Sequence, residues 1–250
     1  METQAMIMAA GLGTRLRPWT LEHPKALVPV HGVPMLERVI GRMRSEGIGR
    51  IVVNVHHFAS QVVEFIREKD FGVEILVSDE SGRLLDTGGA IAKAAPLFGD
   101  ASLLVHNVDI LSNAPLEEIL HRHETSGRDV TLVTSGRDSS RRLMFDAEGV
   151  LRGWHNLNTD EFRPAGIREG LGIQELSQEA FSGIYCLSPK AVASIVDYGK
   201  GIGDDKFPIM DYFLSFPEGV RMEKEYLDGL QLIDIGRPET LRAANEAGII

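Results

Sequence analysis

Cysteine is almost absent from the sequence, whose only thiol is Cys186, in an apolar run. One thiol cannot form an internal disulfide or a cage of thiolate metal ligands, so disulfide scaffolds and dithiol redox centres are excluded. We expect Cys186 to be a small buried hydrophobic residue. The sequence also lacks an apolar run of the roughly 18 residues that cross a bilayer, and its first residues lack the layout of a secretory signal. These absences predict a cytoplasmic protein with no membrane partner.

Positive charge is also scarce, with 26 Lys and Arg residues against 36 Asp and Glu residues and a net charge of −10. Because binding to a nucleic-acid backbone needs clustered positive charge, nucleic acid is excluded as a partner. Any anionic ligand must therefore meet cations that gather locally. The chain is long enough, at 250 residues with 43% hydrophobic content, to bury one full core. We expect a single domain over residues 1–250, as a monomer or a homodimer.

Short apolar runs alternate with amphipathic segments through the first half of the chain. The segment 35–46, for example, places its apolar residues on one helical face and ends at Gly47, a usual residue just past a helix. This βαβα order predicts an α/β fold with a Rossmann-like, mixed but mainly parallel sheet flanked by helices. Such sheets bind ligands at the carboxyl ends of their strands. The expected strands are 5–9, 51–55, 73–77, 103–106 and 130–134.

The periodic pattern weakens between residues 142 and 181. Two pieces of this region, 150–154 and 170–174, indicate either antiparallel strands or a looped insertion beside the sheet. Order returns after residue 181, and the sequence there predicts further strands and helices. The strands are expected at 182–187, 220–226 and 230–233, and the helices at 189–196, 209–213 and 238–247.

A glycine-rich turn follows the first expected strand. Gly11 and Gly13 let backbone N–H groups approach an anion closely, because glycine has no Cβ. Leu16 stands where a dinucleotide motif has its third glycine, and no Gly-Lys-Ser/Thr follows, so the turn is neither of those phosphate loops. Arg15 and Lys25 add cations at the same edge of the sheet and favour a polyphosphate. The alternative is that the glycines only form a turn and the arginine faces water.

Two acidic residues each follow an expected strand, Asp109 after 103–108 and Asp234 after 230–233. Carboxylate oxygens, waters and phosphates are the ligands of Mg²⁺, so both residues are candidates for a magnesium site. Either one could instead begin a turn or cap a helix. Together with Arg15 and Lys25 they form a set of cations and carboxylates that can activate an α-phosphate for attack.

A third stretch, Asp86-Thr87-Gly88-Gly89, begins a helix of small residues. Two uses of it remain open. Asp86 or Thr87 caps the helix, or the paired glycines let a flat nucleobase lie against the backbone.

These motifs together resemble the signature of the sugar-1-phosphate nucleotidylyltransferase family. They are AAGLGTRLRP at 9–18, PKALVPV at 24–30, DTGG at 86–89, Asp109, FSGIY at 181–185 and DIG at 234–236. They occur in the order of the family and cover essentially the whole chain. The resemblance implies a glycosyltransferase-A-like nucleotidyltransferase fold and Mg²⁺ as cofactor. It also implies transfer of a nucleotidyl group from a nucleoside triphosphate to a sugar 1-phosphate, with release of pyrophosphate.

The same resemblance implies a role for each matching residue. Arg15 and Lys25 would be catalytic, and Asp109 and Asp234 would hold the metal ion. The region near 142–181 would be a sugar-binding insertion. The nucleotide would contact Ala10, Gly11, Gly13, Thr14, Gly88 and Gly89, and the substrate would contact Asn107, Ser182 and Gly183.

The chain departs from the family pattern at two places. Val108 precedes Asp109 where the family usually has glycine, which predicts a narrower pocket. The Glu-Lys-Pro element of many relatives has no clear counterpart in residues 153–160, so the sequence does not identify the sugar of the substrate.

The compact length and the DTGG and FSGI variants look most like the bacterial N-acetylmuramate-1-phosphate uridylyltransferases. Mannose-1-phosphate and heptose-1-phosphate guanylyltransferases come next. The sequence does not identify the nucleobase of the triphosphate either. The rival outside catalysis is a silent regulatory relative, and the presence of Arg15, Lys25, Asp109 and Asp234 counts against it.

Overall fold

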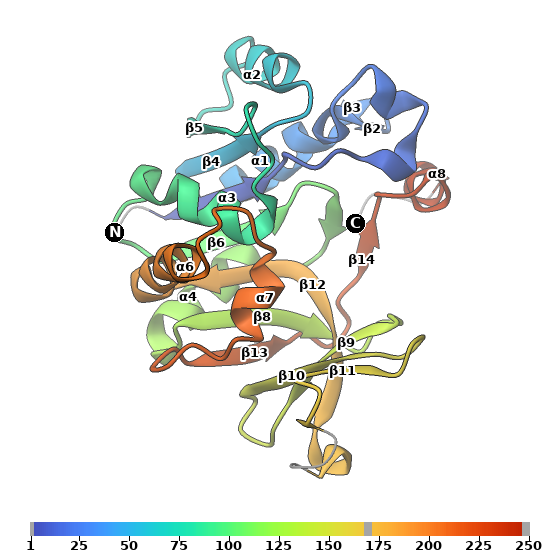
Figure 1. Cartoon of the computed structure of the whole chain (residues 1–250). Coiled ribbons are helices and arrows are strands. Elements are labelled where there is room, and N and C mark those ends of the chain that lie inside the picture. The colour runs from blue at the N-terminus through green and yellow to red at the C-terminus, as the bar shows by residue number, and fades with distance from the viewer. Residues whose placement is uncertain (1–2, 168–171, 247–250) are drawn as a thin grey trace.

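The computed structural model describes residues 3–167 and 172–246 of the chain (Figure 1). Within these residues, ten strands form one mixed sheet in the order β11-β10-β9-β12-β6-β1-β4-β5, with β8 and β13 continuing from β12. Helices cover both faces of the sheet, so the predicted fold class is confirmed. The strands are β1 (Gln4–Met8), β4 (Arg50–Val55), β5 (Glu74–Asp79), β6 (Leu103–Asn107), β8 (Val130–Ser135), β9 (Arg141–Phe145), β10 (Leu151–Asn156), β11 (Glu161–Arg163), β12 (Ser177–Leu187) and β13 (Met222–Tyr226).

Strand β1 is apolar along most of its length because it is buried on both faces. Ala5 and Ile7 pack into one hydrophobic cluster, and Met6 and Met8 pack into another. Side chains alternate across a strand, so each face of the sheet has its own core. The first core is covered by α1 (Met35–Ser45), α2 (Ala59–Arg67), α4 (Leu116–Ser126) and α8 (Pro238–Glu246), and the second by α3 (Asp86–Ala94), α6 (Pro189–Ile202) and α7 (Ile209–Phe213).

The parallel half of the sheet brings several strand ends to one edge. Strand β1 pairs in parallel with β4 and with β6, and β4 pairs in parallel with β5. In this register Met8 stands opposite Asn54 on one side and Asn107 on the other. The loops that follow β1, β4 and β6 therefore leave the sheet side by side.

The other half of the sheet is antiparallel and contains most of the segment 142–181. Strands β9, β10 and β11 pair in antiparallel order, and β9 joins the first part of β12 (Figure 1). The strand expected at 150–154 is confirmed as β10. Of the two alternatives for 170–174, the strand is wrong where the structure describes it, since η5 (Ile173–Glu175) is a 3-10 helix. Residues 170 and 171 lie outside the described residues. Glycines at 170 and 172 weaken a strand there.

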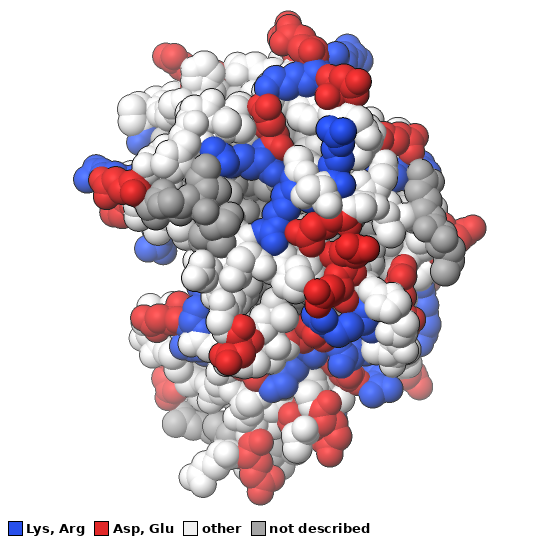
Figure 2. Space-filling view, turned by 180° about the vertical axis from the view of Figure 1, so that it is seen from behind, with Lys and Arg blue, Asp and Glu red and all other residues white. Residues whose placement is uncertain are grey.

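Three global expectations can be compared with the structure. Cys186 is fully buried, as expected for a small hydrophobic residue. No helix among the described residues is long and apolar enough to cross a membrane. On the face shown in Figure 2, acidic and basic side chains lie beside one another rather than separating by sign.

Candidate active site

The loop after β1 is packed tightly at Gly13 and open at Gly11. Gly13 has a φ of 60°, in the left-handed region that favours glycine. A Cβ there would lie 2.8 Å from Cγ2 of Thr20 and 2.9 Å from Cβ of Lys25. A Cβ at Gly11 would have only Cδ of Lys25 nearby, at 4.0 Å, and Gly11 is exposed. The backbone at Gly11 is therefore the part of this loop that a phosphate can approach.

Lys25 lies on the short helix η3 (Lys25–Leu27), and its ammonium forms an ion pair with the carboxylate of Asp109. The two side chains are only 14% and 13% exposed. A buried ammonium needs a partner, and Asp109 provides it. The pair holds the Lys25 ammonium beside the carboxyl end of β6.

Asp234 reaches the same place from the other end of the sequence. It ends β14 (Leu232–Asp234), which pairs in antiparallel order with β7 (Ile110–Ser112), and Asp234 stands opposite Ile110. The N–H of Ile235 donates to the carbonyl of Asp109 at 2.9 Å. These bonds fix the two acidic residues next to each other.

Gly236 marks the point where three charged groups meet. A Cβ at Gly236 would lie 2.8 Å from Oδ1 of Asp234, 3.1 Å from Oδ2 of Asp109 and 2.8 Å from Nη2 of Arg15. Any side chain here would displace charged atoms, so glycine leaves room for their approach. The structure thus brings Arg15, Asp109 and Asp234 together, with Lys25 on Asp109.

This carboxylate pair fits Mg²⁺. Magnesium takes one or two protein carboxylates and completes its octahedron with water and substrate phosphates. Among the described residues, no group of three or more His, Cys, Asp or Glu is arranged to hold a metal ion. Asp109 and Asp234 are the residues that would hold magnesium together with a bound phosphate.

One pocket, called here the strand-end pocket, opens at the carboxyl edge of the parallel strands. Its volume is about 270 Å³. Much of its wall is backbone or uncharged side chain, and three of its described lining residues are charged. It is lined by Met8, Ala10, Gly11, Lys25, Asn54, Leu84, Asp86, Thr87, Asn107 and Asp109.

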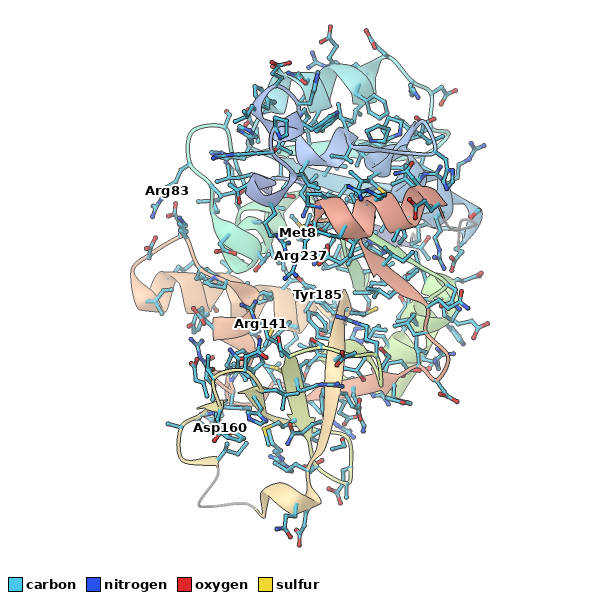
Figure 3. The ribbon with its side chains drawn as sticks, turned by 90° about the vertical axis from the view of Figure 1, so that its right-hand side faces the viewer. Met8, Arg83, Arg141, Asp160, Tyr185 and Arg237 are labelled. Carbon is cyan, nitrogen blue, oxygen red and sulfur yellow. The ribbon has the colours of Figure 1, made fainter. Side chains whose placement is uncertain are left out.

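A second pocket, called here the arginine pocket, has a volume of about 830 Å³. Among the described residues, four arginines line it, together with Asp138 and Asp234. Leu143, Trp154, Phe181 and Met210 provide apolar surface, and Asn156 and Asn158 provide amides. The arginines are Arg15, Arg137, Arg141 and Arg237, the last two of which are labelled in Figure 3.

Arg15 and Asp234 are the only predicted site residues in the arginine pocket. Arg137 follows β8, and its guanidinium donates to the carbonyl of Phe181 at 2.8 Å. Burial lowers the pKa of Arg137, and the Asp234 carboxylate opposes that shift. Sequence reasoning missed Arg137, Arg141 and Arg237. The run GRDSSRR at 136–142, a local concentration of cations in an acidic chain, was the available signal.

The glycines of α3 lie away from the strand-end pocket. The N–H groups of Gly88 and Gly89 donate to the carbonyl of Phe207 at 2.9 and 3.1 Å. A Cβ would lie 2.3 Å from the Phe207 ring at Gly88 and 2.0 Å from the Asp205 carbonyl oxygen at Gly89. The pair therefore permits close packing of the segment before α7, and contact with a base stays a prediction.

The structure tests one of the two uses of this stretch, the cap at the start of α3, and neither Asp86 nor Thr87 is the N-cap residue. Leu85 is the N-cap residue, and it makes no side-chain cap bond. The hydroxyl of Thr87 accepts from the N–H of Ile209 at 2.8 Å, and Asp86 has a φ of 61°. Asp86 and Thr87, rather than the glycines, line the strand-end pocket.

Three residues expected at the substrate have different surroundings. Asn107 lines the strand-end pocket. Gly183 has a φ of 78°, and a Cβ there would lie 2.6 Å from Nδ2 of Asn107, so it makes room for that side chain. Ser182 is buried, and its hydroxyl accepts from the N–H of Ile184 at 3.1 Å. Thr14 is exposed on η1 (Thr14–Leu16) and lines neither pocket.

The departure at Val108 does not have the predicted consequence. Val108 is 2% exposed and packs in the hydrophobic core that contains Ala5 and Ile7. It is not part of the wall of the strand-end pocket. The prediction of a narrower pocket is therefore wrong, because the side chain points into the core instead.

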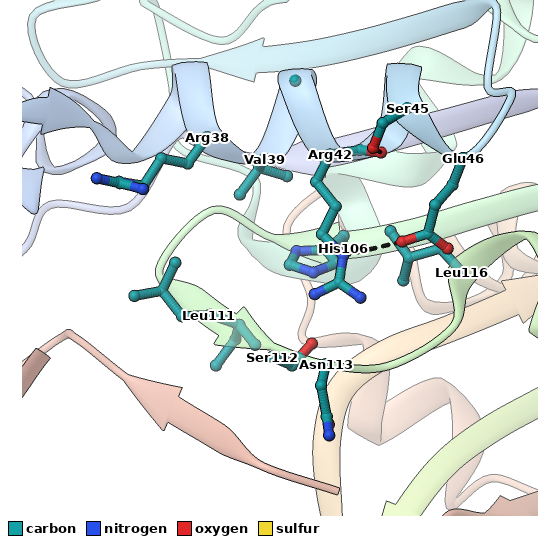
Figure 4. A pocket seen from close by; sticks show the side chains of 12 residues that line it. Arg38, Val39, Arg42, Ser45, Glu46, His106, Leu111, Ser112, Asn113 and Leu116 are labelled. Carbon is teal, nitrogen blue, oxygen red and sulfur yellow. Dashed lines mark hydrogen bonds and ion pairs between the residues drawn. The ribbon is translucent and has the colours of Figure 1, made fainter. Parts of the chain in front are cut away.

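A third pocket, of about 540 Å³, lies between α1 and β7 (Figure 4). Arg42 of α1 and Glu46, the residue directly after α1, form an ion pair at its wall. His106 also lines it, and burial lowers the pKa of this imidazole to about 4. None of the predicted site residues lines this pocket.

Comparison with known proteins agrees with the geometry. A family model described as nucleotidyl transferase matches residues 4–247. N-acetylmuramate alpha-1-phosphate uridylyltransferase of Caulobacter vibrioides is 29% identical over 202 residues, covering 76% of each chain. Mannose-1-phosphate guanyltransferase of Debaryomyces hansenii is 28% identical, covering 97% of this chain and 68% of that one. HddC from Yersinia pseudotuberculosis, solved in complex with GMP-PN, matches with a TM-score of 0.73 and 24% identity over 98% of both chains.

The family match spans nearly the whole described chain, and it includes both acidic residues and the loop after β1. The chain belongs to the nucleotidyl transferase family, as an enzyme of the sugar-1-phosphate nucleotidylyltransferase type.

Proposed function

We propose that the protein transfers a uridylyl group from UTP to an N-acetylmuramate-type sugar 1-phosphate, giving a UDP-sugar and pyrophosphate. The triphosphate occupies the strand-end pocket, and the sugar phosphate occupies the arginine pocket. The observation that carries this proposal is the meeting of Arg15, Asp109 and Asp234 at Gly236. Asp109 lines one pocket and Arg15 and Asp234 line the other, so reactants in the two pockets would meet there.

In the reaction, a phosphate oxygen of the sugar 1-phosphate attacks the α-phosphorus. A new oxygen–phosphorus bond forms, and the bond from the α-phosphorus to the bridging oxygen of pyrophosphate breaks. Arg15 and Lys25 offset the repulsion between the two anions and the charge that develops on the α-phosphate. Alignment of the reactants by the two pockets supplies a further part of the rate. Bound Mg²⁺ would supply additional charge neutralisation.

The charge of the arginine pocket supports an acceptor with more than one anionic group. Four arginines face two carboxylates, one of which, Asp234, is assigned to the metal. A neutral sugar brings only its phosphate to this pocket. An N-acetylmuramate phosphate adds a carboxylate, which pairs with a guanidinium in bidentate geometry. Trp154 offers an aromatic face for the sugar ring.

Guanylyl transfer to mannose 1-phosphate or heptose 1-phosphate is the second candidate, and Asp86 favours it. Asp86 lines the strand-end pocket, with one carboxylate oxygen accepting from the N–H of Thr87 at 2.7 Å. Guanine presents adjacent N–H donors that a carboxylate can accept, whereas uracil presents one N–H between two carbonyls. A silent regulatory relative is the remaining alternative, and it would have no need to keep the four charged residues together.

The test is a matrix of UTP, GTP, dTTP and CTP against N-acetylmuramate, mannose, heptose and glucose 1-phosphates with Mg²⁺, scored by pyrophosphate release. We expect the highest kcat/KM for UTP with N-acetylmuramate 1-phosphate. A maximum with GTP and a neutral sugar phosphate would replace this assignment by the second candidate. Absence of release with every pair would leave the silent relative.

A further inference from the structure

Asn54 and Glu80 form a buried polar pair at the carboxyl edge of the parallel strands. Asn54 is on β4 and Glu80 directly follows β5, and their exposed fractions are 3% and 1%. Nδ2 of Asn54 donates to Oε1 of Glu80 at 2.7 Å. A buried carboxylate costs free energy unless donors satisfy it. Its presence here, without a cation among its hydrogen-bond partners, therefore needs an explanation.

The other ends of this pair hold two separate loops. Oδ1 of Asn54 accepts from the N–H of Ala9 at 2.7 Å. Oε2 of Glu80 accepts from the N–H of Leu85 at 3.1 Å. A continuous chain of hydrogen bonds thus runs from Ala9 through Asn54 and Glu80 to Leu85.

The two loops joined by this chain both line the strand-end pocket. Ala9 directly precedes Ala10 and Gly11, which line the strand-end pocket. Leu85 lies between Leu84 and Asp86, which line it as well. The separation of these loops sets the space available to a nucleotide.

A carboxylate suits this task because each of its two oxygens accepts a hydrogen bond from one of the partners. One oxygen accepts from the Asn54 amide and the other from the Leu85 N–H. If the Asn54 amide were rotated so that its oxygen faced Glu80, this hydrogen bond would be lost. Burial raises the pKa of Glu80, and the hydrogen bonds from Asn54 and Leu85 oppose that rise. Each partner is therefore fixed in one orientation.

We propose that Asn54 and Glu80 are positioning residues for the nucleoside triphosphate, setting the distance between the loop at Ala9–Gly11 and the loop at Leu84–Asp86. The proposal rests on the proposed function, because it needs the triphosphate in the strand-end pocket. Neither side chain is a catalytic residue, since both use their polar groups to hold backbone.

An exchange of the two side-chain types tests the pair. In Glu80→Gln, the new amide faces either the Asn54 amide or the Leu85 N–H, so one donor loses its acceptor. In Asn54→Asp, two carboxylates face each other. The double exchange Asn54→Asp with Glu80→Gln restores every bond, because the glutamine amide donates to the aspartate while Ala9 and Leu85 keep their acceptors. The net charge is also that of the original pair.

We expect each single variant to raise the KM for the triphosphate roughly 10- to 100-fold, as loss of a buried hydrogen bond does. The KM for the sugar phosphate should change far less. The double exchange should return the KM for the triphosphate to within about threefold of the original, through the coupling that neighbouring residues show. Glu74→Gln is the matched control, because Glu74 is a half-exposed carboxylate on β5, the strand that Glu80 follows.

Amide hydrogen exchange on the free protein gives a readout that does not depend on catalysis. Residues 9–11 and 84–86 should lose protection in both single variants and regain it in the double exchange. A wild type that releases no pyrophosphate would reject the proposed function and, with it, the effect on KM. The exchange pattern would still identify whether the pair positions the loops.

Two results would overturn the positioning role. One is a double variant in which the effects of the two single variants add, both in the KM for the triphosphate and in the loss of amide protection. The other is single variants that lower the melting temperature while the KM for the triphosphate stays unchanged, because the pair would then stabilise the fold only.

Discussion

The strand-end pocket and the arginine pocket share one boundary but differ in construction. The first is walled largely by backbone and buried side chains at the ends of parallel strands, and its cation, Lys25, is held by an ion pair with Asp109. The second takes its charge from long side chains on antiparallel strands and loops. A parallel sheet fixes its strand ends by the register of many bonds. Guanidinium groups on flexible stems adapt more readily.

This difference suggests that the two pockets have different roles in substrate recognition. The strand-end pocket has little freedom to accept a different shape, which suits a triphosphate common to many enzymes. The arginine pocket can be changed one side chain at a time without moving the sheet. Substrate specificity for the sugar should therefore reside in the arginine pocket.

Loss of Lys25 should have the largest effect. Under the proposed function, Lys25→Ala removes a cation that offsets the charge of the reacting phosphate. It also leaves Asp109 without its partner, so we expect kcat to fall about 10³-fold. Steady-state kinetics at saturating substrates measures it. Lys93→Ala, which removes a lysine from the exposed side of α3, is the control. Activity within tenfold of the original would remove Lys25 from the site.

The two loop glycines should respond differently to the same methyl group. Gly13→Ala places Cβ against Thr20 and Lys25 and forces alanine into the left-handed backbone conformation. We therefore expect the free energy of unfolding to fall by about 2–4 kcal/mol. Gly11→Ala has space, so its stability should change by less than about 1 kcal/mol while triphosphate binding weakens. Urea unfolding and nucleotide titration separate the two. Equal losses of stability would contradict the description of this loop.

Removal of a guanidinium from the arginine pocket should act on one substrate only. We expect Arg141→Ala to raise the KM for the sugar phosphate about 10-fold, because it removes a charged hydrogen-bond donor. The KM for the triphosphate should stay within about twofold. Arg152→Ala is the control, since Arg152 pairs with Asp146 and does not line the pocket. A parallel rise in both KM values would break the distinction between the pockets.

The smallest effect should arise outside both pockets, at His123. Burial lowers the pKa of His123 to about 4, with Arg128 lowering it further. An unfolded histidine titrates near 6.5. Between pH 6.5 and 4 the unfolded chain binds the proton that the folded protein does not, so stability falls as pH drops through this window. From pH 7 to 5.5 the loss is about 1 kcal/mol.

His123→Gln tests that assignment. The variant should show a flatter dependence of the unfolding free energy on pH, as measured by urea titration at several pH values. An unchanged slope would mean that another group, such as His106, dominates the acid sensitivity.

Several features were predictable because they depend on short segments. The turn at Gly11 and Gly13, the helix α1 and the buried strand β1 each follow from a local pattern of residue types. The buried ion pair of Lys25 was partly predictable, since its apolar neighbours required a partner. The 3-10 helix at η5 and the inward direction of Val108 were not predictable, because each depends on what packs around the segment.

The sequence by itself determined the order of elements, the composition of the opening loop and the presence of two acids at strand ends, because local propensity and periodicity are written in neighbouring residues. Only the tertiary structure decided that Asp234 lies beside Asp109, that Gly88 and Gly89 serve packing, and that arginines from distant parts of the chain line one pocket. These facts depend on strand register and on contacts between residues far apart in the chain. No local pattern specifies such contacts until the whole core has formed.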